Sequence, residues 1–255
     1  MVQPAMAIKL NSTGQIPQPI RHLLRGYKSL FAKYDLIQKV LENTHLYGVA
    51  EELNQVCLQE GIIGYHFTRA IREDIEARGL QLGCGTDRRS DFVSRHGHRF
   101  SEAQRERMHR MWDDYFDALQ TWVRDGKIWF SFTLDALDNG GADRLLTYFG
   151  GEVVYMPLTE DKEIAAILQT IGQPLIVECV LAAERLRTFS VIPWGTIWLS
   201  SYHVTVNRDA LQNDMDAYSE EPVSVSQIVS IRVAVPRGVE SDSDILPTRW
   251  KDPCG

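Results

Sequence analysis

The segment Ile62-Ile63-Gly64-Tyr65-His66-Phe67-Thr68-Arg69, with the helical stretch and the Gly79-Leu80 pair that follow it, decides the fold class of this chain. Its apolar start predicts a strand over 61–68, in which side chains alternate between two faces. His66 and Thr68 therefore share one face at the end of the strand. Apolar residues then recur at helical spacing until a glycine, which predicts a helix over 70–78. A strand that ends in a polar pair and leads into a one-sided helix is typical of the mouth of a cleft.

The remaining periodicity separates helices from strands along the chain. Apolar spacing predicts two or three helices within 20–60, one helix over 101–126 that begins at a Ser101–Gln104 capping box, a short helix over 142–149, and a helix that Thr159 caps and Gly172 ends. The residues around the Arg88-Arg89 pair are expected to form a loop. Alternating or buried apolar runs predict strands over 128–133, 152–156, 175–181, 197–199, 202–206, 223–225 and 228–235. Helices in the first half and strands in the second favour the α+β class.

These patterns suggest one main domain with additions at both ends. We predict an N-terminal helical cap over 1–60, a main domain over 61–236 with a helical insertion over 84–126, and a flexible tail over 237–255.

Composition indicates a globular protein of the cytoplasm. No apolar run reaches the roughly 20 residues needed to cross a bilayer, and the N-terminus has no basic segment followed by an apolar one. Cys57 and Cys179 stand in apolar surroundings and read as buried thiols, as expected in a reducing compartment. The net charge of −7 gives no global attraction to membranes or nucleic acid.

Tyr65-His66-Phe67-Thr68, the following helix and the Gly79-Leu80 pair resemble the first motif of the ADP-ribosyltransferase superfamily, in its His-Tyr-Glu branch. The resemblance implies a split β-sheet core and NAD as a substrate. It also implies transfer of a single ADP-ribose to a nucleic acid or a protein, as in bacterial toxins and phage-defence effectors. Only this first motif is specific. Phe67 stands where glycine is common in the family, and the Ser-Thr-Ser and Glu-x-Glu motifs of the arginine-type branch are absent.

Breaking the N-glycosidic bond of NAD requires that the protein bind the nicotinamide and the ribose in a fixed position. It also requires a carboxylate near the developing positive charge. The resemblance implies that His66 and Thr68 bind the adenosine-side ribose, with Phe67 and Arg69 beside them. Ser131 is expected beside the nicotinamide, and Tyr148 is expected to stack on it, with Tyr155 as a weaker substitute. Arg88 is a candidate for the NAD pyrophosphate, because a guanidinium suits phosphate geometry.

The carboxylate has several candidates. Glu221 comes first, because Glu-Pro-Val-Ser-Val-Ser-Gln-Ile over 221–228 resembles the family's late strand. Glu152 comes second, since Gly150 and Gly151 before it allow close backbone approach to a ligand. Glu220 and then Glu178 follow in that order.

The insertion between the first motif and the strand at 128 contains a cluster of basic residues: Arg88, Arg89, Arg95, Arg99, Arg105, Arg107 and Arg110. With the nearby Phe92 and Phe100, this insertion, Arg88 to Arg110, is the predicted contact to a nucleic-acid acceptor, because phosphates attract cations and bases stack on flat rings.

Two other functions remain open at this point. The fold could bind NAD or a partner without turnover, since Phe67 departs from the family pattern. Alternatively His96, His98 and His109, completed by Asp87 or Asp91, could ligate the metal of a hydrolase, although no H-E-x-x-H motif is present. No phosphate-binding P-loop, dinucleotide glycine fingerprint or G-x-S-x-G motif occurs in the chain.

Overall fold

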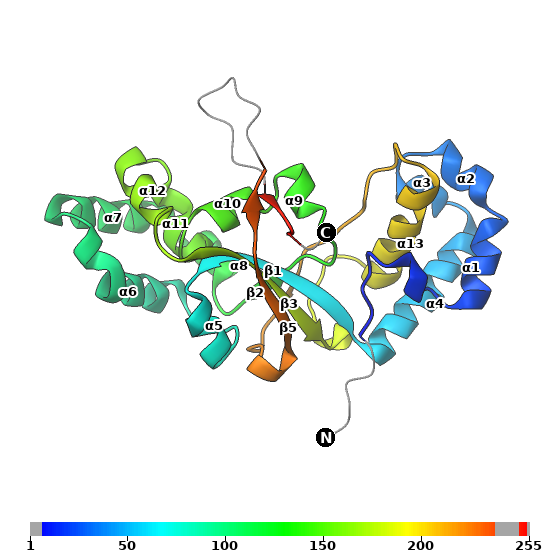
Figure 1. Ribbon diagram of the computed structural model, residues 1–255, viewed down its shortest axis with the longest axis horizontal. Coiled ribbons are helices and arrows are strands. Elements are labelled where there is room, and N and C mark those ends of the chain that lie inside the picture. The colour runs from blue at the N-terminus through cyan, green and yellow to red at the C-terminus, as the bar shows by residue number, and fades with distance from the viewer. Residues whose placement is uncertain (1–6, 238–249, 254–255) are drawn as a thin grey trace. The chain divides into compact units, whose positions relative to one another are not determined.

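The computed structural model describes residues 7–237 and 250–253, and its elements are shown in Figure 1. The described chain is a mixed α+β protein, as the sequence predicts. Its residues cluster into two compact units. Unit 1 comprises residues 1–65, 129–135 and 179–218, and unit 2 comprises 66–128, 136–178 and 219–255. The predicted cap over 1–60 is therefore only part of unit 1, because the helix near residue 200 packs with it.

Unit 1 is mainly helical. Its α-helices are α1 (Gln18–Arg25), α2 (Lys28–Lys33), α3 (Ile37–Val40), α4 (Thr44–Glu60) and α13 (Pro193–Val206), with short 3-10 helices η1 (Thr13–Gln15) and η3 (Ala183–Arg185). Asn43 begins α4 by accepting backbone hydrogen bonds from His45 and Leu46. Helices α4 and α13 lie side by side in Figure 1. They approach so closely at Gly195 that a Cβ there would overlap the carbonyl oxygen of Ala50.

Unit 2 holds the remaining helices: α5 (Arg72–Arg78), α6 (Gly85–His96), α7 (Glu102–Tyr115), α8 (Ala118–Arg124), α9 (Ala136–Asn139), α10 (Asp143–Thr147), α11 (Glu152–Leu158) and α12 (Lys162–Leu168), with 3-10 helices η2 (Gly97–Arg99) and η4 (Val225–Gln227). The predicted Ser101–Gln104 capping box begins α7. Asp161, and not Thr159, caps α12.

The strands form three small sheets among the described residues. They are β1 (Ile62–Ala70), β2 (Ile128–Phe130), β3 (Gln173–Leu181), β4 (Ala217–Ser219), β5 (Ile228–Val233), β6 (Val235–Pro236) and β7 (Trp250–Lys251). One sheet has the order β1-β3-β5, and β2-β4 and β6-β7 form two-stranded sheets. β1 and β3 each contribute residues to both units.

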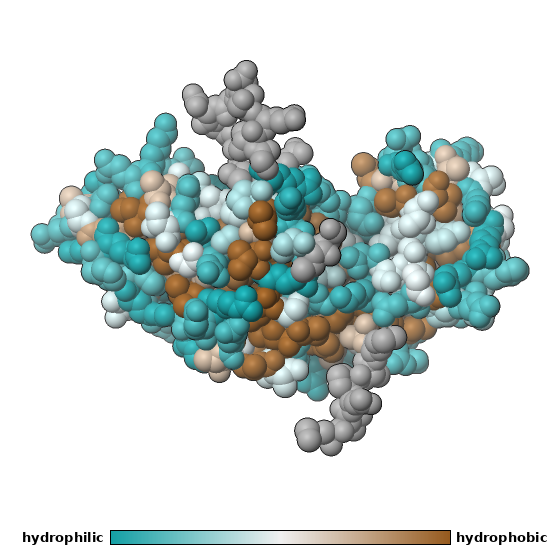
Figure 2. Space-filling model, viewed as in Figure 1, coloured by the Kyte–Doolittle hydropathy of each residue, from teal (hydrophilic) through white to brown (hydrophobic). Residues whose placement is uncertain are grey.

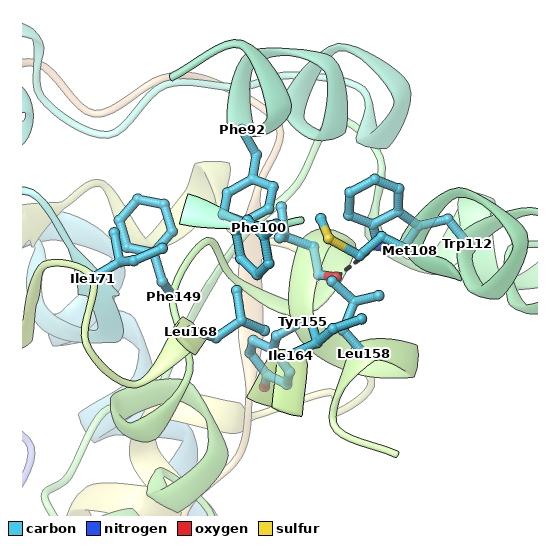
Figure 3. Packing of buried hydrophobic residues seen from close by; sticks show 11 residues of the cluster. Phe92, Phe100, Met108, Trp112, Phe149, Tyr155, Leu158, Ile164, Leu168 and Ile171 are labelled. Carbon is cyan, nitrogen blue, oxygen red and sulfur yellow. Dashed lines mark hydrogen bonds between the residues drawn. The ribbon is translucent and has the colours of Figure 1, made fainter. Parts of the chain in front are cut away.

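The core of unit 2 is an aromatic and aliphatic cluster, drawn in Figure 3. Phe92, Phe149 and Trp112 pack together in it with tilted or edge-on rings. The Trp112 indole N–H is buried and donates to the carbonyl oxygen of Val154 at 2.8 Å, so this polar atom is satisfied inside an apolar core. The cluster joins α6, α7, α11 and α12 into one helical layer.

The structure corrects several predicted elements. Strands were expected over 197–199 and 202–206, but one helix, α13, covers both. Residues 193–203 of α13 are all buried, so its apolar residues show no one-sided helical spacing and its aromatic and β-branched residues mimic strands. The strand expected over 152–156 is helix α11, and the loop expected around Arg88-Arg89 is helix α6. The helix expected over 101–126 breaks at Phe116, where Asp117 caps α8. At 223–225 only Val223 forms a bridge.

The chain end also differs from the flexible tail predicted over 237–255. Trp250–Lys251 form β7, which pairs antiparallel with β6, and Trp250 is buried. Residues 238–249 and 254–255 of that prediction lie outside the described residues, and the structure therefore does not test it there. Cys57 and Cys179 are buried as predicted, and burial raises the pKa of the Cys57 thiol to about 12. In the described part of the chain, no helix combines the length and the apolar character that a membrane crossing requires.

Candidate functional site

Residues 65–68 of the motif strand β1 have the predicted alternation, and the residues before them in the strand are all buried. Tyr65 and Phe67 are buried, whereas His66 and Thr68 are partly exposed on the other face. Phe67 is only 4% exposed and packs in the core, so it offers almost no surface to a ligand. His66 and Thr68 are thus accessible on one face of β1, as the sequence predicts.

The end of β1 is joined to the segment that carries Tyr148. Arg69 forms a parallel bridge with Phe149, and the Gly150 N–H donates to the Arg69 carbonyl oxygen at 3.3 Å. Tyr148 comes directly before this bridge. Its ring is half-buried against the core cluster, with its centroid 5.7 Å from that of Tyr155.

The Arg69 guanidinium bonds to backbone. Its Nε donates to the Ile171 carbonyl oxygen at 2.8 Å, and Nη1 donates to the Leu146 carbonyl oxygen at 3.3 Å. Burial lowers the pKa of Arg69. These contacts tie the end of α10 and the turn after α12 to β1, so in this structure Arg69 positions the Tyr148 segment.

The Gly79-Leu80 pair is joined to the segment that carries Glu221. Leu80 forms an antiparallel bridge with Val223, with both backbone hydrogen bonds at 2.9 Å. Gly79 has a φ of +73°, and a Cβ on it would overlap the carbonyl oxygen of Val223. Only glycine combines this backbone conformation with so close an approach. The glycine of the motif is therefore explained by its contact with the Glu221 segment.

The backbone of Glu221 is fixed on its other side by Ser219. The Glu221 N–H donates to Ser219 Oγ at 3.0 Å, and the Ser219 hydroxyl donates to the Glu221 carbonyl oxygen at 2.8 Å. Ser219 is buried, whereas Glu220 and Glu221 are exposed. Sequence reasoning missed Ser219, although a serine two residues before a candidate glutamate is typical of a side-chain-bonded turn.

The other carboxylate candidates are engaged in ion pairs. Glu152 begins α11, and its Oε2 lies 2.9 Å from Nε of Arg124. Glu178 is buried in β3, and its Oε2 lies 2.7 Å from Nη1 of Arg232. Tyr155 is a core residue whose pKa burial raises strongly.

Ser131 belongs to unit 1 and pairs antiparallel with Tyr65, with hydrogen bonds of 2.8 and 3.0 Å. Its Oγ donates to Asp216 at 3.3 Å. Next to it, the carboxylate of Asp214 accepts hydrogen bonds from the Phe132 N–H and from both the N–H and the hydroxyl of Thr133. No sequence pattern pointed to this aspartate turn, because its partners are 81 or 82 residues away.

The basic insertion differs from the expected nucleic-acid surface. Phe92 and Phe100 are buried in the core, so neither ring is available to stack on a base. Most of the arginines bond to the protein itself: Arg88 to the Gln81 carbonyl, Arg89 to that of Val153, Arg95 to Asp74, Arg105 to the Gly97 and Phe100 carbonyls, and Arg107 to Asp161 and Glu163. Arg99 and Arg110 are exposed, with no ion pair among the described residues. The Arg88 guanidinium thus folds back onto the segment that precedes α6.

Two of the three histidines considered as metal ligands pack against aromatic rings, and His98 is exposed. The His96 ring centroid is 4.8 Å from that of Phe149, and the His109 ring is 5.6 Å from that of Trp112. Within the described ranges, no three His, Cys, Asp or Glu side chains are grouped so that they could hold a metal ion.

Comparison with protein-family models, with curated proteins and with solved structures gave no match for this chain. The functional argument therefore depends on the geometry of the residues themselves.

Proposed function

We propose that this chain is an NAD-dependent mono-ADP-ribosyltransferase that uses His66, Tyr148 and Glu221. The support is one set of backbone pairings in unit 2. The segment 66–80 is hydrogen-bonded at Arg69 to the Tyr148 segment and at Leu80 to the Glu221 segment. The Tyr148 and Glu221 segments are thus attached to the motif that carries the resemblance, although each is 68 or more residues away from it in sequence.

Each residue has a role suited to its environment. His66 and Thr68 present hydrogen-bonding groups on the accessible face of β1, as binding of a ribose requires. Tyr148 offers a half-buried ring for stacking on the nicotinamide. Glu221 offers an exposed carboxylate on a backbone that Ser219 and Leu80 hold from both sides.

In the proposed reaction the bond between C1′ of the ribose and the nicotinamide nitrogen breaks, and its electron pair leaves with neutral nicotinamide. A lone pair of the acceptor forms the new bond to C1′. The acceptor proton passes to the Glu221 carboxylate, whose negative charge also stabilises the cationic sugar.

The test is transfer of label from radiolabelled NAD to a macromolecular acceptor, with nicotinamide release measured in parallel. We expect Glu221→Gln to lower both rates by about 10²–10⁴-fold, as for loss of a general base. Glu220→Gln is the matched control next to it and should retain activity. Full activity of Glu221→Gln would contradict the assignment, and loss only in Glu152→Gln would move the role to that residue.

A second candidate is an NAD-binding module of the same fold without turnover. The pairing of Glu152 with Arg124 and of Glu178 with Arg232 favours it, because two of the candidate carboxylates are neutralised. Saturable NAD binding in calorimetry, with no nicotinamide release over hours, would support this candidate and would contradict the proposed transferase activity.

A further inference from the structure

The helices α1 and α2 of unit 1 carry a concentration of positive charge that the proposed chemistry does not use. Residues 7–41 contain six Lys or Arg and a single Asp, in a chain whose net charge is −7. We define the α1–α2 basic face as Arg21, Arg25, Lys28 and Lys33. Arg25, Lys28 and Lys33 are exposed, and hydrophilic residues predominate along the edge of the molecule near α1 in Figure 2.

The sequence brings these cations close together. The buried residues of α1 and α2 are Ile20, Leu24 and Phe31. Arg21 and Arg25 are four residues apart in α1, so they lie on one side of this helix, next to its buried residues. A turn at Gly26 and Tyr27 separates α1 from α2, which begins at Lys28 and ends at Lys33.

These charges are not neutralised within the protein. In the described part of the chain, none of the four forms an ion pair, and Nε of Arg21 is buried without a hydrogen-bond partner. Lys33 lies over the ring of Tyr34, with Nζ 4.9 Å from its centroid. The contrast with the arginines of the insertion is clear, since Arg95 and Arg107 are paired with carboxylates.

We propose that the α1–α2 basic face binds the phosphate backbone of a nucleic acid. Arg21 and Arg25 are about 6 Å apart along α1, at a rise of about 1.5 Å per residue, and Lys28 follows at the start of α2. Phosphates on one strand of duplex DNA follow one another every ~3.4 Å along the axis, so cations at this spacing suit phosphates along one strand. Contacts to phosphate alone position a nucleic acid without reading its sequence.

The chemistry of the face favours nucleic acid over the other polyanions. An interface with an acidic protein has an apolar centre, but between residues 18 and 33 no large hydrophobic side chain is exposed. Binding to an anionic membrane by an amphipathic helix needs an apolar face to insert, and the apolar stripe of α1 and α2 is buried in unit 1. A polar, strongly positive surface is typical of nucleic-acid binding.

If the chain is a transferase as proposed, this face identifies nucleic acid as the class of acceptor. This assignment of the acceptor rests on the proposed function, whereas binding of nucleic acid by the face does not. The test measures binding separately, by fluorescence anisotropy of a labelled 20-base-pair DNA duplex and of labelled single strands. We expect affinity for the duplex to fall about 100-fold between 50 and 200 mM salt, as four phosphate contacts imply. The triple variant R25Q/K28Q/K33Q should bind at least tenfold more weakly at 100 mM salt and show a shallower salt dependence.

The matched control is R99Q/R110Q, which removes the two unpaired, exposed cations of the insertion. It should bind like the wild type, and equal loss in both variants would overturn the proposal. Absence of binding at 50 mM salt would also overturn it, as would tighter binding to polyglutamate or to phosphatidylserine vesicles than to DNA. Nicotinamide release by the triple variant without acceptor should be unchanged, so a failure of the binding proposal is distinguishable from a failure of the enzyme proposal.

Discussion

Gly79 shows how a single residue links the motif to the candidate carboxylate. Its φ of +73° and the closeness of the Val223 carbonyl leave no room for a side chain. In sequence terms it is an ordinary helix end, and the structure adds a second reason for glycine at this position. Glycine at position 79 is thus a physical requirement of this fold.

We expect Gly79→Ala to destabilise the protein and to displace the Glu221 segment. The matched control is Gly126→Ala, because Gly126 has a similar φ of +65° but no heavy atom within 4 Å of its Cβ position. The control should lose about 1–2 kcal/mol from its left-handed backbone alone. Urea unfolding should give a clearly larger loss of unfolding free energy for Gly79→Ala than for the control. Equal losses would show that the close approach of the Val223 carbonyl does not contribute to the cost of the substitution.

His96 is the residue whose charge most directly affects the core of unit 2. Burial lowers its pKa from about 6.5, and the nearby Arg95 and Arg99 lower it further. The neutral ring is therefore favoured in the folded state. Its contribution to stability is complete above about pH 6.5 and is lost as the pH falls toward the lower folded-state pKa.

We expect the free energy of unfolding, measured in urea, to fall on acidification below pH 6.5, by about 1.4 kcal/mol for each pKa unit of lowering. His96→Phe keeps an aromatic ring beside Phe92 and Phe149 and should remove this part of the pH dependence. His22→Asn, at an exposed position in α1, should retain the part that His96 contributes. An unchanged pH profile in His96→Phe would contradict this account.

At the scale of elements, predictions succeeded where periodicity is one-sided and failed where burial is complete. The strand and helix of the first motif and the capped helix after Ser101 have clear patterns, and the structure contains them. Helix α13 has no such pattern because its whole first three turns are buried. Helix α6 has few apolar residues and is capped by Cys84, which is not a usual capping residue.

The ion network of β3, β5 and the residues after β7 is an element-scale feature that the sequence did not reveal. Nη1 of Arg232 lies 2.7 Å from Glu178 Oε2, and its Nε and Nη2 donate to Asp252 at 3.0 and 2.7 Å. Both carboxylates are almost fully buried. The three residues are 54 and 20 positions apart, and no local pattern joins them.

We expect Arg232→Met to destabilise the protein by about 3–5 kcal/mol, because it removes the guanidinium that both buried carboxylates bind. Arg237→Met is the matched control. Arg237 pairs with Asp138 on the surface, where an ion pair contributes about 0–1 kcal/mol. Thermal unfolding of both variants at pH 7 provides the measurement, and similar melting temperatures would contradict a stabilising role for the network.

At the scale of the whole molecule, the sequence predicted the fold class and the order of the candidate segments, but not their attachments. His66 and Thr68 lie on the accessible face, as strand alternation requires. The roles of Arg69, Ser219 and Arg124 depend on partners that only the folded chain brings near. For the same reason the sequence did not reveal that Arg95 and Arg107, in the predicted basic surface, meet carboxylates from other elements.

The most direct test of the central claim is amide hydrogen exchange of the full chain with and without NAD. The account predicts that NAD slows exchange together in three segments of unit 2: 66–70, 148–152 and 219–223. Exchange in α1 and α2 should not change, since NAD does not engage the α1–α2 basic face. Slowing in only one of the three segments, or in none at saturating NAD, would contradict a site built from His66, Tyr148 and Glu221.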